Sequence, residues 1–292
     1  MGLPSRASVA GKLAGVAMLV GTTVLWGTSF SFIKLSVGVM SSLEYTSYRC
    51  LIATTILAPA VLVKAVRGEF SRGDYLRGLA IGVAYALGLL LQGEGTRYTT
   101  PSISAFLTAL NSINVHLYVA LVEKRYHWLD ALALLLAVSG LYAISMPSGG
   151  LGVGELLILL GSVAWAAQII LVSKYGRGGI VEILAGTFTP GALLSPLAAA
   201  VFGNTMNLAA LAYLAYLAVV CSIGATFLQV LGPRRVSPLA AAVIFLLEPV
   251  FATLFSLAMG LEELTLHKAV GGGLIVASTY IATYSEIRYA KY

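Results

Sequence analysis

The sequence predicts an all-α membrane protein with about ten transmembrane helices, arranged as two inverted repeats of five. Of its 292 residues, 59% are hydrophobic and only 10% are charged, whereas soluble domains carry about 25% charged residues. Long apolar runs follow one another along the chain, and a helix needs about 20 mostly apolar residues to cross a bilayer. A short polar pattern also occurs twice, once in each half of the chain.

The apolar runs predict ten spans, at about residues 12–34, 42–63, 76–96, 101–122, 128–146, 153–174, 181–202, 208–230, 237–260 and 267–286. The first lacks a small-residue cleavage site, so we expect a retained helix instead of a signal peptide. A basic stretch from Lys64 to Arg77 separates the second span from the third. Pro101 opens the fourth span, and Pro249 inside the ninth predicts a kink.

The duplicated pattern consists of Gln92, Gly95, Arg97 and Pro101, which recur with the same spacing as Gln229, Gly232, Arg234 and Pro238. Trp26 likewise recurs as Trp165 and Glu44 as Glu182, in nearly the same register. Such self-similarity indicates a duplicated architecture, with one repeat over residues 1–147 and the second over 148–292. Five helices per repeat bring the second copy into the membrane from the opposite side, a plan typical of secondary transporters.

The basic residues predict the orientation. With both termini in the cytoplasm, fourteen of the eighteen basic residues lie on the cytoplasmic side, as the positive-inside rule requires. These are Arg6, Lys12, Lys64, Arg67, Arg72, Arg77, Lys124, Arg125, Lys174, Arg177, Arg234, Arg235, Arg288 and Lys291. The net charge of +6 is therefore interpreted as loop charge facing the cytoplasm, and not as a nucleic-acid-binding surface.

Several short motifs resemble the EamA type of the drug/metabolite transporter superfamily over nearly the whole chain. They are Trp26-Gly27, Arg49, Pro101 and Glu123 in the first half, and Pro238, Leu247-Glu248-Pro249-Val250, Gly260-Leu261-Glu262 and Gly271 to Gly273 in the second. The resemblance implies a ten-helix carrier of small metabolites such as amino acids, often moved outward. Substrate does not follow from fold.

The fourth span holds the richest set of polar residues. Ser104, Thr108, Asn111 and Ser112 share one side of a helix, and Asn114 and Tyr118 extend an adjoining face. Polar groups inside a membrane usually face the bundle or a water-filled cavity, so this face predicts a cavity wall. The alternative is hydrogen bonding between helices, worth about 0.6 kcal/mol per contact.

Three ionisable residues within spans are candidates for a functional role. Glu248 occupies the position of Asn111 in the other repeat, and it is a proton-coupling carboxylate, a partner for a cationic substrate group, or a structural charge paired with a basic residue or with backbone donors freed by Pro249. His116 is a second coupling candidate, because imidazole titrates near physiological pH, although a neutral residue bonded to a neighbouring helix fits better. Arg49 binds a substrate carboxylate or ties helices together, and it lies one helical turn after Tyr45, within reach on one helix face.

The expected site lies near mid-membrane, surrounded by the first, third, fourth, sixth, eighth and ninth helices, with the fifth and tenth at the periphery. Its predicted substrate-binding residues are Trp26, Gln92, Thr108, Asn111, Asn114, Tyr118, Trp165, Gln168, Gln229 and Glu248. The two tryptophans lie inside their spans, away from the interfaces where aromatic belts form, so packing and a cavity wall both remain open for them.

These features favour a secondary transporter of the cell membrane for an amino acid or related amphipathic solute. An intramembrane enzyme and a structural subunit are the alternatives, and the enzyme would need a nucleophile with its base, or a metal set. An ATP site of the phosphate-loop type would show a Gly-Lys-Ser/Thr pattern, and the sequence contains none. We expect no cofactor, no metal and no nucleic acid. The expected partners are a small solute and membrane lipid, and the sequence leaves open whether the chain forms a homodimer.

Overall fold

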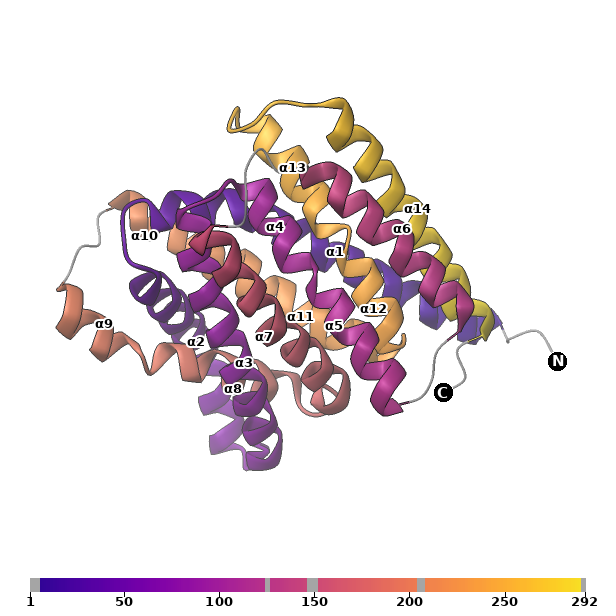
Figure 1. Cartoon of the computed structure of the whole chain (residues 1–292). Coiled ribbons are helices and arrows are strands. Elements are labelled where there is room, and N and C mark those ends of the chain that lie inside the picture. Colours follow the sequence, from indigo (N-terminus) through magenta and orange to yellow (C-terminus); the bar gives the residue numbers. More distant parts are fainter. Residues whose placement is uncertain (1–5, 124–126, 146–151, 204–207, 290–292) are drawn as a thin grey trace.

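The computed structural model describes residues 6–123, 127–145, 152–203 and 208–289, and within them every regular element is a helix. Each of the ten expected spans is present, as one helix or as consecutive helical pieces (Figure 1). The expected boundary between the repeats, at 147/148, lies outside the described residues, as do Lys124, Arg125 and Lys291 of the orientation argument.

Six spans are single helices. They are α1 (Arg6–Val37), α2 (Ser42–Val66), α3 (Arg72–Arg97), α6 (Trp128–Ser145), α7 (Val153–Tyr175) and α14 (Leu266–Tyr289). The fourth span comprises α4 (Pro101–Ala109), α5 (Asn111–Tyr118) and the π-helical η1 (Val119–Glu123), and the seventh comprises α8 (Ile180–Ala192) and α9 (Ser195–Phe202). The eighth comprises α10 (Leu208–Tyr216), the π-helical η2 (Leu217–Gly224), α11 (Ala225–Leu231) and the 3₁₀-helical η3 (Gly232–Arg234), and the ninth α12 (Pro238–Phe245) and α13 (Glu248–Ala258).

The helices have the length and composition of membrane spans. Eight helical stretches in the described ranges are long and apolar enough to cross a bilayer, and two shorter apolar stretches, Trp128–Gly140 and Ala269–Ala282, belong to α6 and α14. Large apolar side chains such as Leu62, Val83 and Leu160 are exposed on the outside of the bundle. Lipid is the solvent that such a surface requires, so the chain is a multi-pass membrane protein.

Local sequence signals set several helix starts. Ser41 and Glu44 form a capping box at the start of α2, in which each residue accepts the backbone N–H of the other. Thr100 caps α4 and Ser237 caps α12 through their hydroxyl groups, and each cap is followed by a proline in the first turn. The two caps immediately precede the repeated prolines, so the duplication extends to how the fourth and ninth spans begin.

The fourth and ninth spans are both broken, at equivalent positions. The N–H of Leu110 bonds to the carbonyl of Leu107 at 3.3 Å, and the N–H of Leu247 bonds to Ile244 at 3.0 Å, so both turns tighten to an i→i+3 pattern. Pro249 lies in the first turn of α13, where its missing N–H does no harm. The expected kink is therefore a break just before the proline, and the expected span over 101–122 is present but contains a break that its sequence does not signal.

The repeated arginines make the same contact in both halves. Arg97, at the end of α3, donates from Nη2 to the carbonyl of Met40 at 2.9 Å, and Arg234 donates from Nη2 to the carbonyl of Gly178 at 2.8 Å. Met40 and Gly178 occupy matching places in the loops that precede α2 and α8. The duplicated pattern thus ties the third and eighth spans to equivalent loops.

The helices differ in how centrally they pack. Helices α6 and α14 lie side by side along one edge of the bundle (Figure 1), joined by a hydrogen bond from Ser278 Oγ to the carbonyl of Ala133 at 2.7 Å. The peripheral position expected for the fifth and tenth helices is therefore confirmed. Near the centre α3 packs closely on α8, because Gly82 brings the backbones together: a Cβ atom there would lie 2.5 Å from the carbonyl oxygen of Thr187.

Candidate functional site

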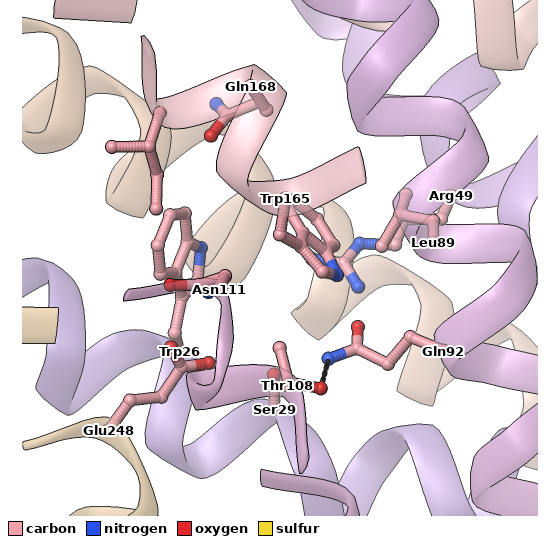
Figure 2. A pocket seen from close by; sticks show the side chains of 11 residues that line it. Trp26, Ser29, Arg49, Leu89, Gln92, Thr108, Asn111, Trp165, Gln168 and Glu248 are labelled. Atoms are coloured by element: carbon pink, nitrogen blue, oxygen red, sulfur yellow. Dashed lines mark hydrogen bonds between the residues drawn. The ribbon is translucent and has the colours of Figure 1, made fainter. Parts of the chain in front are cut away.

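A buried pocket lies between residues of the two sequence halves (Figure 2). The region holds about 380 Å³ of space free of protein atoms, a volume that includes open solvent and is therefore not that of a closed cavity. Helices α1, α2, α3, α4 and α5 of the first half and α7 and α13 of the second line it. The lining residues are Trp26, Ser29, Arg49, Leu89, Gln92, Thr108, Asn111, Trp165, Gln168, Ile169 and Glu248.

The two helix breaks supply one polar residue each to the pocket. Asn111 is the first residue of α5 and Glu248 the first residue of α13, at equivalent positions of the two repeats. Both side chains are buried, and Asn111 Oδ1 has no hydrogen-bond partner. The Glu248 carboxylate makes no hydrogen bond or ion pair with any described residue, and Figure 2 shows it on a different side of the pocket from Arg49. The broken helices thus place unsatisfied acceptors at the pocket.

Arg49 is held by hydroxyl groups and not by a carboxylate. Its Nη1 donates to the Tyr45 hydroxyl at 2.5 Å, the i,i+4 contact expected from the sequence, and its Nε donates to Ser222 Oγ at 2.7 Å. Tyr85 also donates to Ser222, at 3.0 Å, and Ser222 lies in the π-helical η2. These partners are neutral, so within the described residues the guanidinium is buried without a counter-charge.

The two repeated tryptophans face each other, with ring centroids 6.2 Å apart. The Trp26 indole N–H is satisfied by the carbonyl of Cys221, in η2, at 3.0 Å. The Trp165 indole N–H is buried and has no hydrogen-bond partner. Its ring lies on Gly88, where a Cβ atom would come within 2.8 Å. Equivalent positions thus provide one satisfied indole and one indole able to donate to a ligand.

The glutamines at the pocket are committed to protein partners. Gln92 donates to Thr108 Oγ1 at 3.1 Å, across α3 and α4. Gln168 and Gln229 exchange two reciprocal bonds of 2.8 Å, which hold α7 against α11. Gln229 is fully buried behind Gln168 and does not line the pocket. These amides set the positions of helices more than they offer free groups to a solute.

The structure brings seven of the ten predicted substrate-binding residues into the pocket. They are Trp26, Gln92, Thr108, Asn111, Trp165, Gln168 and Glu248. Gln229, Asn114 and Tyr118 are not among the lining residues: Asn114 is half-buried, and the Tyr118 hydroxyl bonds to Lys174. The second helix contributes Arg49 to the lining, whereas the expected eighth helix contributes none.

The remaining polar residues of the fourth span contact neighbouring helices or turns. Ser104 bonds to Thr96 at 2.6 Å, and Ser112 bonds to the carbonyl of Ala242 at 2.6 Å. His116, the second coupling candidate, is buried outside the pocket, and its Nδ1 lies 2.8 Å from the carbonyl of Ser112. The polar face therefore divides into a pocket part, at Thr108 and Asn111, and a packing part.

Four lining residues lie outside the predicted set: Arg49, for which the sequence left a substrate carboxylate open as a partner, and Ser29, Leu89 and Ile169, which sequence reasoning missed. Ser29 and Ile169 each lie about one helical turn after a repeated tryptophan, Trp26 and Trp165, so each shares a helix face with it. That spacing could have found them. Leu89 carries no such signal. The described residues contain no group of three or more His, Cys, Asp or Glu side chains able to hold a metal ion.

Comparison with known proteins identifies the same duplicated plan. Residues 13–146 and again residues 152–284 match the EamA-like transporter family. An uncharacterized transporter of Archaeoglobus fulgidus is 29% identical over 266 residues, covering 89% of this chain and 82% of that protein. A second uncharacterized transporter of this organism is 25% identical over 286 residues, covering 92% and 97%.

A solved crystal structure shares the fold, with a TM-score of 0.74 over 94% of this chain and 98% of the other, at 19% sequence identity. The family match covers both halves of the sequence and nearly all of its ten spans. The two matched segments meet close to the expected boundary between the repeats. The chain therefore belongs to the EamA-like transporter family.

Proposed function

We propose that this protein is a secondary transporter that exports an amino acid or related amphipathic solute across the cell membrane by alternating access. The observation that carries the proposal is the buried pocket, which joins residues of both sequence halves and leaves polar groups of several kinds without partners. Ligand sites are concave and mostly apolar, with a few polar groups that orient the ligand. Membrane carriers place such sites between their repeats.

The lining favours an amino acid over a phosphate ester. Two tryptophans, Leu89 and Ile169 give the pocket apolar walls, whereas Asn111 and Glu248 supply acceptors. A phosphate is usually recognised by several convergent lysine or arginine side chains, and Arg49 is the only basic residue in the lining. The pocket suits a solute with a small polar head and an apolar body.

Alternating access is supported by features that the halves share. Both the fourth and the ninth span are broken next to the pocket, at Leu110 and Leu247, so each half has its own hinge point. We propose an inverted arrangement of repeats over 1–147 and 148–292, with both termini in the cytoplasm. The basic-residue distribution supports that orientation, and the outward direction rests on the family resemblance.

For ion coupling, the pocket favours Glu248 over His116. Glu248 lines the pocket and has no partner among the described residues, whereas His116 lies on α5 outside it. A coupling group must sense whether the site is occupied, and only Glu248 is placed to do so.

Reconstitution tests the proposed function. The purified full chain is placed in liposomes preloaded with one unlabelled amino acid at a time, and uptake of the same labelled amino acid is measured against protein-free liposomes. We expect at least one of the twenty amino acids to accumulate in a protein-dependent, saturable way. Failure of every one, in a folded preparation that exchanges a different solute, refutes the amino-acid assignment but leaves a transporter.

A further inference from the structure

We propose that the pocket recognises a zwitterion, with Arg49 binding the carboxylate and Glu248 the ammonium group of one solute molecule. The inference rests on the proposed function, because it specifies the charges of the solute that the transporter carries. It starts from one basic and one acidic residue, 2% and 6% exposed, that line the same pocket without forming an ion pair with each other.

A buried charge without a counter-charge is strongly unfavourable. Proteins that carry one usually pair it within the structure, yet Arg49 and Glu248 have no counter-ion among the described residues. Figure 2 shows them on different sides of the pocket, with Trp165 drawn on the Arg49 side and Asn111 on the Glu248 side. A single solute that carries both charges would compensate both residues at once, and an uncharged solute would compensate neither.

The Arg49 side is arranged to bind a carboxylate. Tyr45 and Ser222 fix Nη1 and Nε of the guanidinium, and Nη2 has no hydrogen-bond partner in the described structure. Trp165 adds a second donor, because its indole N–H is buried in the pocket lining without a partner. A carboxylate accepts several hydrogen bonds, and those from a guanidinium are among the strongest.

The Glu248 side is arranged to bind an ammonium group. Its carboxylate and the unpaired Oδ1 of Asn111 are both acceptors that line the pocket. An ammonium group has three donors and no acceptor, so the two side chains match its chemistry. Asn111 and Glu248 begin the second parts of the fourth and ninth spans, so each half supplies one ligand.

The scaffold is duplicated, but Arg49 and Glu248 each occur in only one of the two halves. Trp26 and Trp165 repeat, but Glu248 replaces the amide of Asn111, and Thr187 stands where the register of Glu44 and Glu182 places the equivalent of Arg49. The solute must therefore bind in one orientation relative to the two halves. The two indoles line the pocket and supply an apolar wall on which its side chain can pack.

Matched analogues of one amino acid test the recognition of each charge. In liposomes containing the full chain, uptake of the best-transported labelled amino acid is competed by its α-carboxamide, which lacks the carboxylate, and by its deaminated acid, which lacks the ammonium group. Each analogue should compete at least about tenfold more weakly than the unlabelled amino acid, because it loses a charge-assisted contact. An analogue that competes within about twofold of the amino acid overturns the proposal.

Two variants assign the charges to residues. Glu248→Gln should weaken competition by the amino acid about tenfold and leave the deaminated acid unchanged, so that the preference between them disappears. Arg49→Lys, which retains a positive charge in case Arg49→Gln fails to fold, should reduce the preference for the amino acid over its carboxamide. Glu69→Gln and Arg67→Gln, at exposed positions between α2 and α3, are the matched controls.

The outcomes separate this proposal from the proposed function. Transport of amino acids with equal transport of their carboxamides removes the zwitterion site but leaves an amino-acid transporter. Transport of other solutes only removes both. If Glu248→Gln weakens binding of the amino acid and both analogues equally, Glu248 has a structural role and the assignment is overturned. If the variant keeps its selectivity and loses only the dependence of transport on a pH gradient, Glu248 is a proton carrier and the assignment is likewise overturned.

Discussion

Trp26 and Trp165 occupy equivalent positions, yet only one indole has its hydrogen bond. The difference arises in the partner helix. Cys221, which accepts from Trp26, lies in the π-helical η2, whereas its equivalent in the first half lies in the regular helix α3. A π-helical turn perturbs the regular ladder and often marks a functional site. One tryptophan therefore stabilises the fold and the other is left to contact a ligand.

The two tryptophans should respond differently to replacement by phenylalanine. Trp26→Phe leaves the Cys221 carbonyl without its donor and should lower the free energy of unfolding by about 1 kcal/mol more than Trp165→Phe. Trp165→Phe should instead raise the KM for the solute. Thermal unfolding in detergent and uptake in liposomes measure the two effects, and equal destabilisation by both changes would contradict the assignment.

Asn111 and Asn114 provide a second residue-scale comparison. Asn111→Ala removes a buried acceptor of the pocket and should raise KM by roughly two- to tenfold, the equivalent of about 0.5–1.5 kcal/mol. Asn114→Ala, at a half-buried position outside the lining, should leave KM unchanged. An equal rise in KM for both variants would show that Asn114 also contributes to the binding site.

Sequence could predict individual pocket residues where chemistry and repetition coincide. Asn111, Glu248 and the tryptophans were found because polar or repeated residues inside a membrane span are unusual. Asn114 was included because helix periodicity alone does not separate a pocket wall from a helix contact. For Arg49 the sequence leaves substrate binding and a structural role open, and the structure gives it hydrogen bonds to Tyr45 and Ser222 as well as a place in the pocket lining.

At the scale of helices, the sequence predicts where α4 and α12 start, but it signals only one of the two helix breaks. Caps and prolines define where α4 and α12 begin. Pro249 signals a disturbance of the ninth span, but the equivalent break at Leu110 has no proline. No residue type in the fourth span signals that break. Because the repeat aligns Leu110 with Leu247, a break predicted in the ninth span could also have been predicted in the fourth.

The packing of α3 on α8 gives an element-scale prediction. Gly82→Ala would place a methyl group 2.5 Å from the Thr187 carbonyl oxygen and should destabilise the protein by about 1–3 kcal/mol. Gly73→Ala, near the start of α3 with nothing within 4 Å of the added atom, should be neutral or stabilise by up to about 1 kcal/mol. Thermal unfolding of the pair checks this, and equal effects would mean that the contact tolerates a side chain.

For the whole molecule, composition and duplication predicted the class of fold, because ten apolar runs leave few other structures for the chain. The prediction named five of the six spans that line the pocket, and it placed the eighth there in place of the second. The second helix lines it through Arg49, and the eighth does so only indirectly, through Gln229 behind Gln168. Which helices line the pocket depends on how all ten pack together, and no single residue in the sequence indicates it.

The orientation in the membrane has its own test. Single cysteines replacing Glu69, between α2 and α3, and Val39, between α1 and α2, lie at exposed positions in consecutive loops. The native Cys50 and Cys221 are buried and should give little background. A membrane-impermeant thiol reagent applied to intact cells should label Val39→Cys and spare Glu69→Cys. The reverse pattern would place both termini outside.

The central claim is that solute passes through the pocket shared by the two halves, and covalent blockage at Ser29 tests it most directly. Ser29→Cys changes little in size at a buried lining position, whereas Ser139→Cys, at an exposed position on α6, is the control. Treatment with a small methanethiosulfonate reagent should stop amino-acid uptake in Ser29→Cys liposomes only, and a transported amino acid should slow the modification. Full uptake after complete modification of Ser29→Cys would contradict the account.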